Sequence, residues 1–304
     1  MYIRPIPKQV LIFTQWISLK GFRQCVTIFL CVTVLSSCRL LQRKFTHPDL
    51  NNIPPRTDQL SSGTTFIKNA PAGGLERELT IYNEISRGNI PDFLRSMKHV
   101  KVEWVSPSGI NHTFIFKVLP DYMAIGPDSD FVRIPMTSDT AQRIADFTDT
   151  ILPSVKMVDA IYMNARVKLE PQPLPESYQM GSNEFYLDHN RMIERQRLGG
   201  GAKLGSLIAG DKKDLVITNR LNNNPGHLAI YGWHRMEDGK PVPIQPLSVA
   251  HLKDYVDYSH GVRLVSKKVL VDGKVRPIAN ILGDPELSGA LSDEGPIKDI
   301  RVIR

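Results

Sequence analysis

The spacing of apolar side chains predicts a helix near residue 75, followed by a β-hairpin. Apolar residues recur there at the intervals of one helix face, namely Leu75, Leu79, Tyr82 and Ile85. The pair Gly88 and Asn89 suits the end of this helix, and a short helix is expected to open at Pro91. Residues 100–105 and 112–119 flank a Ser-Pro-Ser-Gly turn and have the composition of a hairpin.

Two short extended segments, at residues 122–125 and 131–134, are expected after the hairpin. The apolar spacing beyond them predicts two more helices, the first capped by Thr137 or Ser138 and the second by Ser154. Residues 171–175 read Pro-Gln-Pro-Leu-Pro, which continues neither a helix nor a central strand. We interpret them as the boundary between an N-terminal lobe of residues 75–170 and a C-terminal lobe of residues 176–304.

The C-terminal lobe is predicted to hold one helix and then mostly strands. Ser182 suits the cap of a helix that ends at Gly199, Gly200 and Gly201. Strands are expected at residues 215–218, 227–234, 262–266 and 269–271, with turns between them. Because no long helix alternates with these strands, the pattern predicts an α+β fold: a helical N-terminal part with a hairpin, and a mostly antiparallel β lobe at the C-terminus.

The first 38 residues have the order of a secretory signal peptide. Four basic residues and no acidic one precede an apolar run of residues 25–35, and Ser36 and Ser37 follow it. A helix over that run is only about 16 Å long at ~1.5 Å per residue, too short for a ~30 Å hydrocarbon layer. The alternatives are an ordinary signal peptide with a chance cysteine, and an anchor helix over residues 10–35, which Lys20 and Arg23 would interrupt.

Residues 35–38, Leu-Ser-Ser-Cys, resemble the lipobox of bacterial lipoproteins. The resemblance implies cleavage before Cys38, acylation of its thiol, and a membrane anchor made of lipid. Arg39 replaces the aspartate associated with inner-membrane retention, which favours the outer membrane where the cell has one. The polar residues 39–74, rich in Pro, Asn, Ser and Thr, are then expected to be a tether between membrane and folded domain.

Removal of residues 1–38 changes both the charge and the available chemistry. The net charge falls from +7 to +3, so the basic composition is no evidence for a nucleic-acid partner. All three cysteines also leave the folded body, since they lie at positions 25, 31 and 38. The mature chain therefore holds no disulfide, no thiolate metal site and no cysteine nucleophile.

Histidines concentrate in the C-terminal lobe and give the strongest chemical signal. Five of the eight lie between residues 189 and 260. An imidazole titrates near neutral pH and a carboxylate can fix its tautomer, so His260 and Asp257 have the parts of a general base. His251 and His234 are expected to assist them. His189, on an apolar helix face, is expected to be a core residue.

Three further predictions concern this cluster. Alternation along strand 227–234 places His234 on the core-facing side with Leu228 and Ile230. A divalent metal held by His234, His251, Asp257 and His260 is a second possibility, although the spacing matches no common zinc motif. The neighbouring Arg263, Trp233 and Tyr258 are candidate substrate-binding residues, and the aromatic side chains either stack on sugars or fill the core.

Four segments together resemble a group of uncharacterised exported bacterial proteins: residues 131–137, 210–214, 229–234 and 257–263. A narrower resemblance is to the L,D-transpeptidase domain, in which an Ala-Ile-His-Gly strand precedes a Ser-His-Gly-Cys-Ile-Arg block. Residues 229–232 read Ala-Ile-Tyr-Gly, and residues 259–263 read Ser-His-Gly-Val-Arg. Because the cysteine nucleophile is missing, the resemblance implies a related β-rich scaffold and not that family's transfer reaction.

These observations lead to one leading hypothesis and one alternative. The leading hypothesis is a lipid-anchored envelope protein that hydrolyses a cell-wall or other periplasmic polymer, with His260 as base and Asp257 orienting it. The alternative is a non-catalytic envelope lipoprotein that binds glycan, such as peptidoglycan, or a protein partner. The proximity of residues 234, 251, 257 and 260 in space distinguishes the two.

Overall fold

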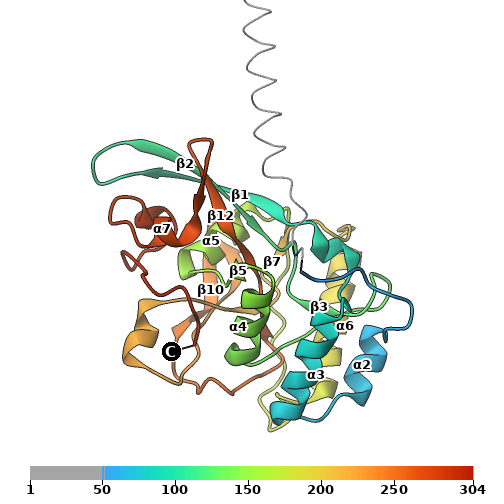
Figure 1. The fold of residues 1–304 in the computed structure, drawn as a ribbon. Coiled ribbons are helices and arrows are strands. Elements are labelled where there is room, and N and C mark those ends of the chain that lie inside the picture. Colours follow the sequence, from blue (N-terminus) through green and yellow to red (C-terminus); the bar gives the residue numbers. More distant parts are fainter. Residues whose placement is uncertain (1–49, 51, 304) are drawn as a thin grey trace, which may run out of the picture. The chain divides into compact units, whose positions relative to one another are not determined.

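The computed structural model describes residue 50 and residues 52–303, which fold as one compact unit (Figure 1). The predicted signal peptide and Cys38 lie outside the described residues. Six α-helices and three short 3₁₀ helices occur in the described part, namely α2 (Gly63–Asn69), α3 (Gly74–Ser86), η1 (Asp92–Arg95), α4 (Ser138–Phe147), α5 (Val155–Asn164), α6 (Asn183–Gly199), η2 (Asn219–Asn223), α7 (Ile278–Leu282) and η3 (Ser288–Ala290). None of them is long and apolar enough to cross a membrane.

An antiparallel five-stranded sheet combines strands from both predicted lobes. Its strands run in the order β1-β2-β12-β13, with β5 also paired to β12: β1 (Lys98–Val105), β2 (Asn111–Val118), β12 (Val265–Val271), β13 (Lys274–Pro277) and β5 (Thr150–Ile151). The pairing of β12 with β2 and β5 brings residues separated by more than a hundred positions into one sheet. The predicted lobes therefore share a sheet, and residues 171–175 do not divide the structure in two.

The second sheet has four strands and carries three residues of the predicted site, Trp233, His234 and His260. Its order is β10-β9-β8-β11: β10 (Lys240–Ser248), β9 (Ile230–Glu237), β8 (Lys213–Leu215) and β11 (His260–Gly261). Only the pairing of β8 with β11 is parallel. Two small pairs complete the sheets, namely β3 (Ala124–Ile125) with β4 (Val132–Arg133), and β6 (Val167–Lys168) with β7 (Ile208–Ala209). The α+β prediction is confirmed.

The helix boundaries follow the predicted caps. The side-chain oxygens of Thr137, Ser154 and Ser182 each accept a hydrogen bond from the backbone N–H three residues later. Helix α3 contains the four predicted apolar residues, but Leu75 and Leu79 are exposed while Ile81 and Ile85 are buried. Helix α2 packs against α6, and Figure 1 shows both near α3. Local capping and spacing therefore determine where these helices begin and end.

The tether is shorter than the sequence predicted. Residues 50–74 contain α2, and Leu50, Ile53, Phe66 and Ile67 are buried in the main core. These apolar residues lack a regular period because most of the segment is a loop, so the pattern did not reveal their burial. The described part of the predicted tether thus belongs to the folded domain.

A buried ionic cluster holds the segment that leads into β8. The guanidinium of Arg133 is fully buried and donates to both oxygens of Asp121, at 2.9 and 2.6 Å. It also lies 3.6 Å from Asp211, at the start of the Asp211-Lys212-Lys213 run. Burial lowers the pKa of Lys212 to about 7, and its ammonium donates to the carbonyl of Tyr258. The cluster therefore ties β8 to the 257–260 turn.

Candidate functional site

An open hollow of about 550 Å³ lies where the 257–260 turn meets β8. Its walls come from three segments: the loop before α6, the start of β8, and residues 251–257. We name it the Asp257 hollow after its central carboxylate, and it is lined by Glu176, Ser177, Met180, Lys213, His251, Tyr255 and Asp257. Two of the four predicted catalytic residues therefore line one hollow.

Asp257 is the best-connected side chain of this hollow. Its Oδ1 accepts hydrogen bonds from the backbone N–H and the hydroxyl of Ser259, and its Oδ2 accepts one of 3.2 Å from the Tyr255 hydroxyl. Burial alone would raise the pKa of Asp257, but the positive charge that His260 carries when protonated at low pH, the Ser259 hydrogen bond and the charge of Lys213 outweigh it and lower the pKa. The carboxylate is therefore ionised at neutral pH.

His260 lies directly behind Asp257, with its Nε2 3.7 Å from Oδ2. Its side chain is completely buried, and neither ring nitrogen has a hydrogen-bond partner among the described residues. Burial lowers the pKa of His260 to about 4, against an opposing effect of the Asp257 charge. The imidazole is thus neutral at pH 7 and enclosed, which does not suit the predicted role of a base that contacts substrate.

His251 reaches the hollow from the opposite side of Tyr255. The two rings stack at 4.1 Å between centroids with an angle of 15°, and the edge of Tyr255 faces His260 at 5.6 Å. Tyr255 therefore connects the half-buried imidazole of His251 with Asp257 and the fully buried imidazole of His260. Of the two imidazoles, His251 is the one that a substrate in the hollow can contact.

Lys213 supplies the cation of the hollow. Its backbone N–H donates to the carbonyl of Ser259 at 2.8 Å, and its Cα is paired with that of His260 across the parallel strands. The ammonium lies 5.2 Å from the centre of the Trp233 ring and makes no hydrogen bond or ion pair with another described residue. The charge of Lys213 acts on Asp257 without an ion-pair contact, so the N–H groups of this half-buried ammonium are available to bind a ligand anion.

His234 belongs to a different cluster, which corrects the predicted orientation of its side chain. Its Nε2 lies 2.7 Å from Oδ1 of Asp159, which also accepts a 2.8 Å hydrogen bond from the Tyr231 hydroxyl. Gly232 and Trp233 have φ values of 106° and 55°, in the left-handed region, so the alternation of faces breaks between Tyr231 and His234. His234 accordingly packs against Tyr231 and stacks on Tyr162 of the main core, at 5.0 Å between ring centroids, and it is buried as predicted.

The three predicted substrate-binding residues lie inside the protein and do not line the hollow. Arg263 is 1% exposed, lies over the Tyr122 ring and donates to the carbonyl of Leu119. Trp233 and Tyr258 pack edge to face against each other in the main core, with His189 beside both rings. Their part in the site is indirect, since Trp233 supports Lys213 and the Tyr258 carbonyl holds Lys212.

The described residues contain no group of three or more His, Asp or Glu side chains placed to share a metal ion. His234 cannot join such a group because it is bound to Asp159, and His260 is enclosed behind Tyr255. Glu176, Ser177 and Met180 form one wall of the Asp257 hollow and were not predicted, because the sequence around them carries no chemical signal. Lys213 was not predicted either, although it lies in the charged run after Gly210, which is the sequence signal that could have identified it.

Comparison of the chain with protein-family models, with curated proteins and with solved structures finds no match. The chemistry of the Asp257 hollow must therefore be argued from its own residues.

Proposed function

We propose that the chain is a lipid-anchored protein of the bacterial cell envelope that hydrolyses an amide or ester bond in a cell-wall or other periplasmic polymer. The observation that carries the proposal is the contact of His251, Tyr255, Asp257 and His260 in one row at the wall of an open, polar hollow. The lipobox-like sequence before Cys38 supports the location, and Cys38 lies outside the described residues.

In the proposed reaction a water molecule is the nucleophile. His251 takes one proton from the water as its oxygen attacks the substrate carbonyl carbon, and the Lys213 ammonium stabilises the oxyanion that forms. The intermediate then collapses, the bond from carbon to the leaving nitrogen or oxygen breaks, and His251 returns the proton to that atom. The products are one carboxylic acid and one amine or alcohol.

Asp257 and the groups behind it act on this step through charge and position. The ionised carboxylate offsets the positive charge that develops on His251, and the Tyr255 ring between them fixes the plane of the imidazole. His260 is a positioning residue in this scheme, because its ring fills the space behind Asp257 and holds the carboxylate toward the hollow. This assigns the role of base to His251 and not to His260.

The experiment incubates the purified chain with peptidoglycan sacculi and follows released fragments by mass spectrometry. We expect His251→Ala to lower turnover by about 100-fold or more, the usual contribution of a general base. Lys213→Met is expected to lower it by about 10-fold or more, as for loss of an oxyanion donor. The control is His112→Ala. His112 lies on the β1–β2 hairpin, where its Nδ1 contacts Asp272, and its replacement should keep full turnover.

Two results would contradict the proposal. Turnover that is unchanged in both hollow variants would remove the Asp257 hollow as the active site. Tight binding of sacculi with no fragment released by the wild-type chain would instead support a non-catalytic envelope lipoprotein.

A further inference from the structure

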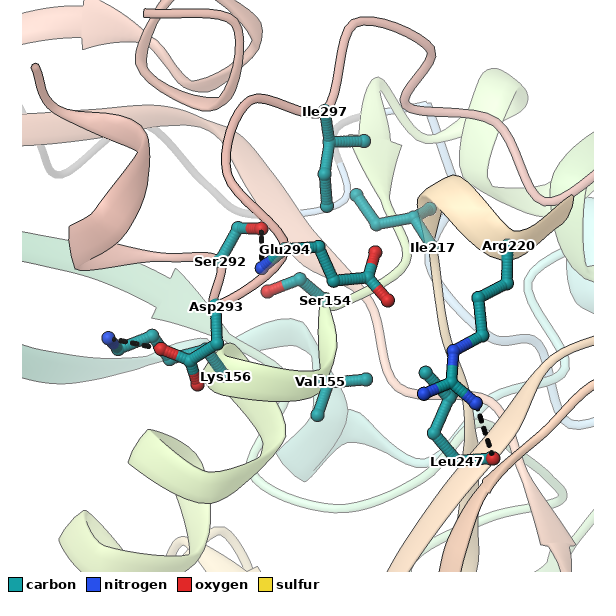
Figure 2. Close-up of a pocket in the computed structure, with 10 residues that line it drawn as sticks. All are labelled: Ser154, Val155, Lys156, Ile217, Arg220, Leu247, Ser292, Asp293, Glu294 and Ile297. Carbon is teal, nitrogen blue, oxygen red and sulfur yellow. Dashed lines mark hydrogen bonds and ion pairs between the residues drawn. The ribbon is translucent and has the colours of Figure 1, made fainter. Parts of the chain in front are cut away.

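A second hollow shares no lining residue with the Asp257 hollow, and Figure 2 shows its side chains. We name it the Arg220 pocket. It has a volume of about 280 Å³ and lies between the start of α5, η2, the end of β10 and residues 292–297. That volume is at the lower limit of small-molecule sites, so the pocket suits a ligand of few atoms and not a polymer chain.

The floor of the Arg220 pocket is apolar and preformed. Val155, Ile217, Leu247 and Ile297 line it, and Ile217 and Ile297 are almost completely buried. Backbone hydrogen bonds fix both isoleucines, since the N–H of Ile217 donates to Pro153 and that of Ile297 to Leu282. A surface of branched aliphatic side chains favours a branched aliphatic group on the ligand.

Two opposite charges stand at the pocket without pairing with each other. The guanidinium of Arg220 donates one 3.3 Å hydrogen bond to the carbonyl of Leu247 and makes no ion pair with a described residue. The carboxylate of Glu294 accepts hydrogen bonds from the Thr218 hydroxyl at 2.6 Å and the Asn219 N–H at 2.8 Å. Both groups are thus held by neutral partners, and Figure 2 shows them facing each other across the pocket.

The other charged pair at the pocket is already satisfied. Lys156 lies 2.7 Å from Asp293 and also above the Trp104 ring, so neither charge is free for a ligand. The unmatched charges are therefore one cation, Arg220, and one anion, Glu294. A ligand with a single charge would satisfy one of them and face repulsion from the other.

We propose that the Arg220 pocket binds a free α-amino acid with a branched aliphatic side chain. The ligand carboxylate receives hydrogen bonds from the unused N–H groups of Arg220, and the ligand ammonium donates to Glu294. The side chain rests on Val155, Ile217, Leu247 and Ile297. This site is independent of the proposed hydrolysis, because none of its residues lines the Asp257 hollow.

The first test is isothermal titration of the full chain with leucine and three analogues. Leucinamide lacks the carboxylate, 4-methylpentanoate lacks the ammonium group, and glycine lacks the side chain. We expect saturable binding of leucine, and a loss of affinity of about tenfold or more for each analogue. Equal affinity for leucine and 4-methylpentanoate would overturn the role of Glu294, and no binding of leucine at about 10 mM would overturn the proposal.

Variants assign the binding to this pocket. Arg220→Met should weaken leucine binding by about tenfold or more while leaving the affinity for leucinamide nearly unchanged. Leu247→Trp, which fills the pocket, should abolish binding, and thermal unfolding checks that each variant is folded. Arg166→Met, at an exposed arginine outside the pocket, is the matched control. Leucine affinity that is unchanged in both pocket variants would overturn the proposal.

Discussion

Two His–Asp pairs in the four-stranded sheet region differ in how completely their hydrogen bonds are made. In the first, His234 and Asp159 are 2.7 Å apart, and Tyr231 donates to the same carboxylate oxygen. In the second, His260 lies 3.7 Å from Asp257, while Ser259 and Tyr255 donate hydrogen bonds to the carboxylate. The first pair lines neither hollow, whereas Asp257 lines the larger one.

The difference separates a pair whose contacts are all structural from the pair at our proposed active site. Buried polar groups in native proteins nearly always have partners, so a buried imidazole with neither nitrogen bonded calls for an explanation. His234 satisfies this rule and stabilises the packing of α5 on β9. His260 does not, and it stands behind Asp257, a carboxylate that lines the larger hollow.

The largest expected effect is on the pH dependence of stability. Since burial lowers the pKa of His260 to about 4, the unfolded chain binds a proton at this residue from pH 6.5 downward while the folded chain does not. Stability is therefore lost as the pH falls from 6.5 to 4, by about 3 kcal/mol for this group. His260→Phe removes that loss.

Urea unfolding of both proteins from pH 7 to pH 4 measures the effect. Burial raises the pKa of Asp211 and of Asp214 to about 6, so these groups add stability as the pH falls. They remain in the variant, as does His189, whose pKa burial lowers to about 2. The difference between wild type and variant thus reports His260 together with its charge interaction with Asp257, and parallel pH curves would contradict a neutral buried imidazole.

The next effect is the cost of replacing each histidine at pH 7. His234→Phe leaves Asp159 without its imidazole partner and should lower the free energy of unfolding by about 2 kcal/mol. His260→Phe removes no hydrogen bond and costs only the fit of a slightly larger ring, so its cost should stay at about 1 kcal/mol. Denaturant midpoints give both values, and an equal cost would abolish the contrast between the pairs.

The smallest effect comes from the tyrosines that donate to the two carboxylates. Tyr231→Phe should cost about 1 kcal/mol of stability through loss of one hydrogen bond, with turnover unchanged. Tyr255→Phe should lower the free energy of unfolding by no more than Tyr231→Phe does. It should also reduce turnover, because Asp257 loses a hydrogen-bond donor beside the hollow. Parallel measurements of unfolding and turnover on both variants test this, and the reverse pattern would place the function at Asp159.

Local signals in the sequence predicted much of the fold. Caps at Thr137, Ser154 and Ser182 and the apolar spacing in α3 needed no distant contact. Strand β10 was missed because Pro241, Pro243 and Pro246 argue against a strand. The strand forms because it pairs on one side only, with β9. The pairing of β12 with β2 depends on tertiary contacts and has no local signature.

The candidate site likewise has a part that local sequence predicts and a part that depends on tertiary contacts. Residues 251–260 are close in sequence, so the meeting of His251, Asp257 and His260 was predictable from one segment. Lys213 reaches them through a parallel strand pair, and a single sequence gives no register for such a pair. The orientation of His234 failed for a local reason, the positive φ values at Gly232 and Trp233, which are rare for tryptophan.

The most direct test of the central claim compares turnover of Asp257→Asn and Asp159→Asn on peptidoglycan sacculi under conditions in which both variants are folded. The Asp257 hollow as active site predicts a loss of about 100-fold or more for Asp257→Asn and a change within about threefold for Asp159→Asn. Equal turnover of the two variants, or a loss confined to Asp159→Asn, would contradict it.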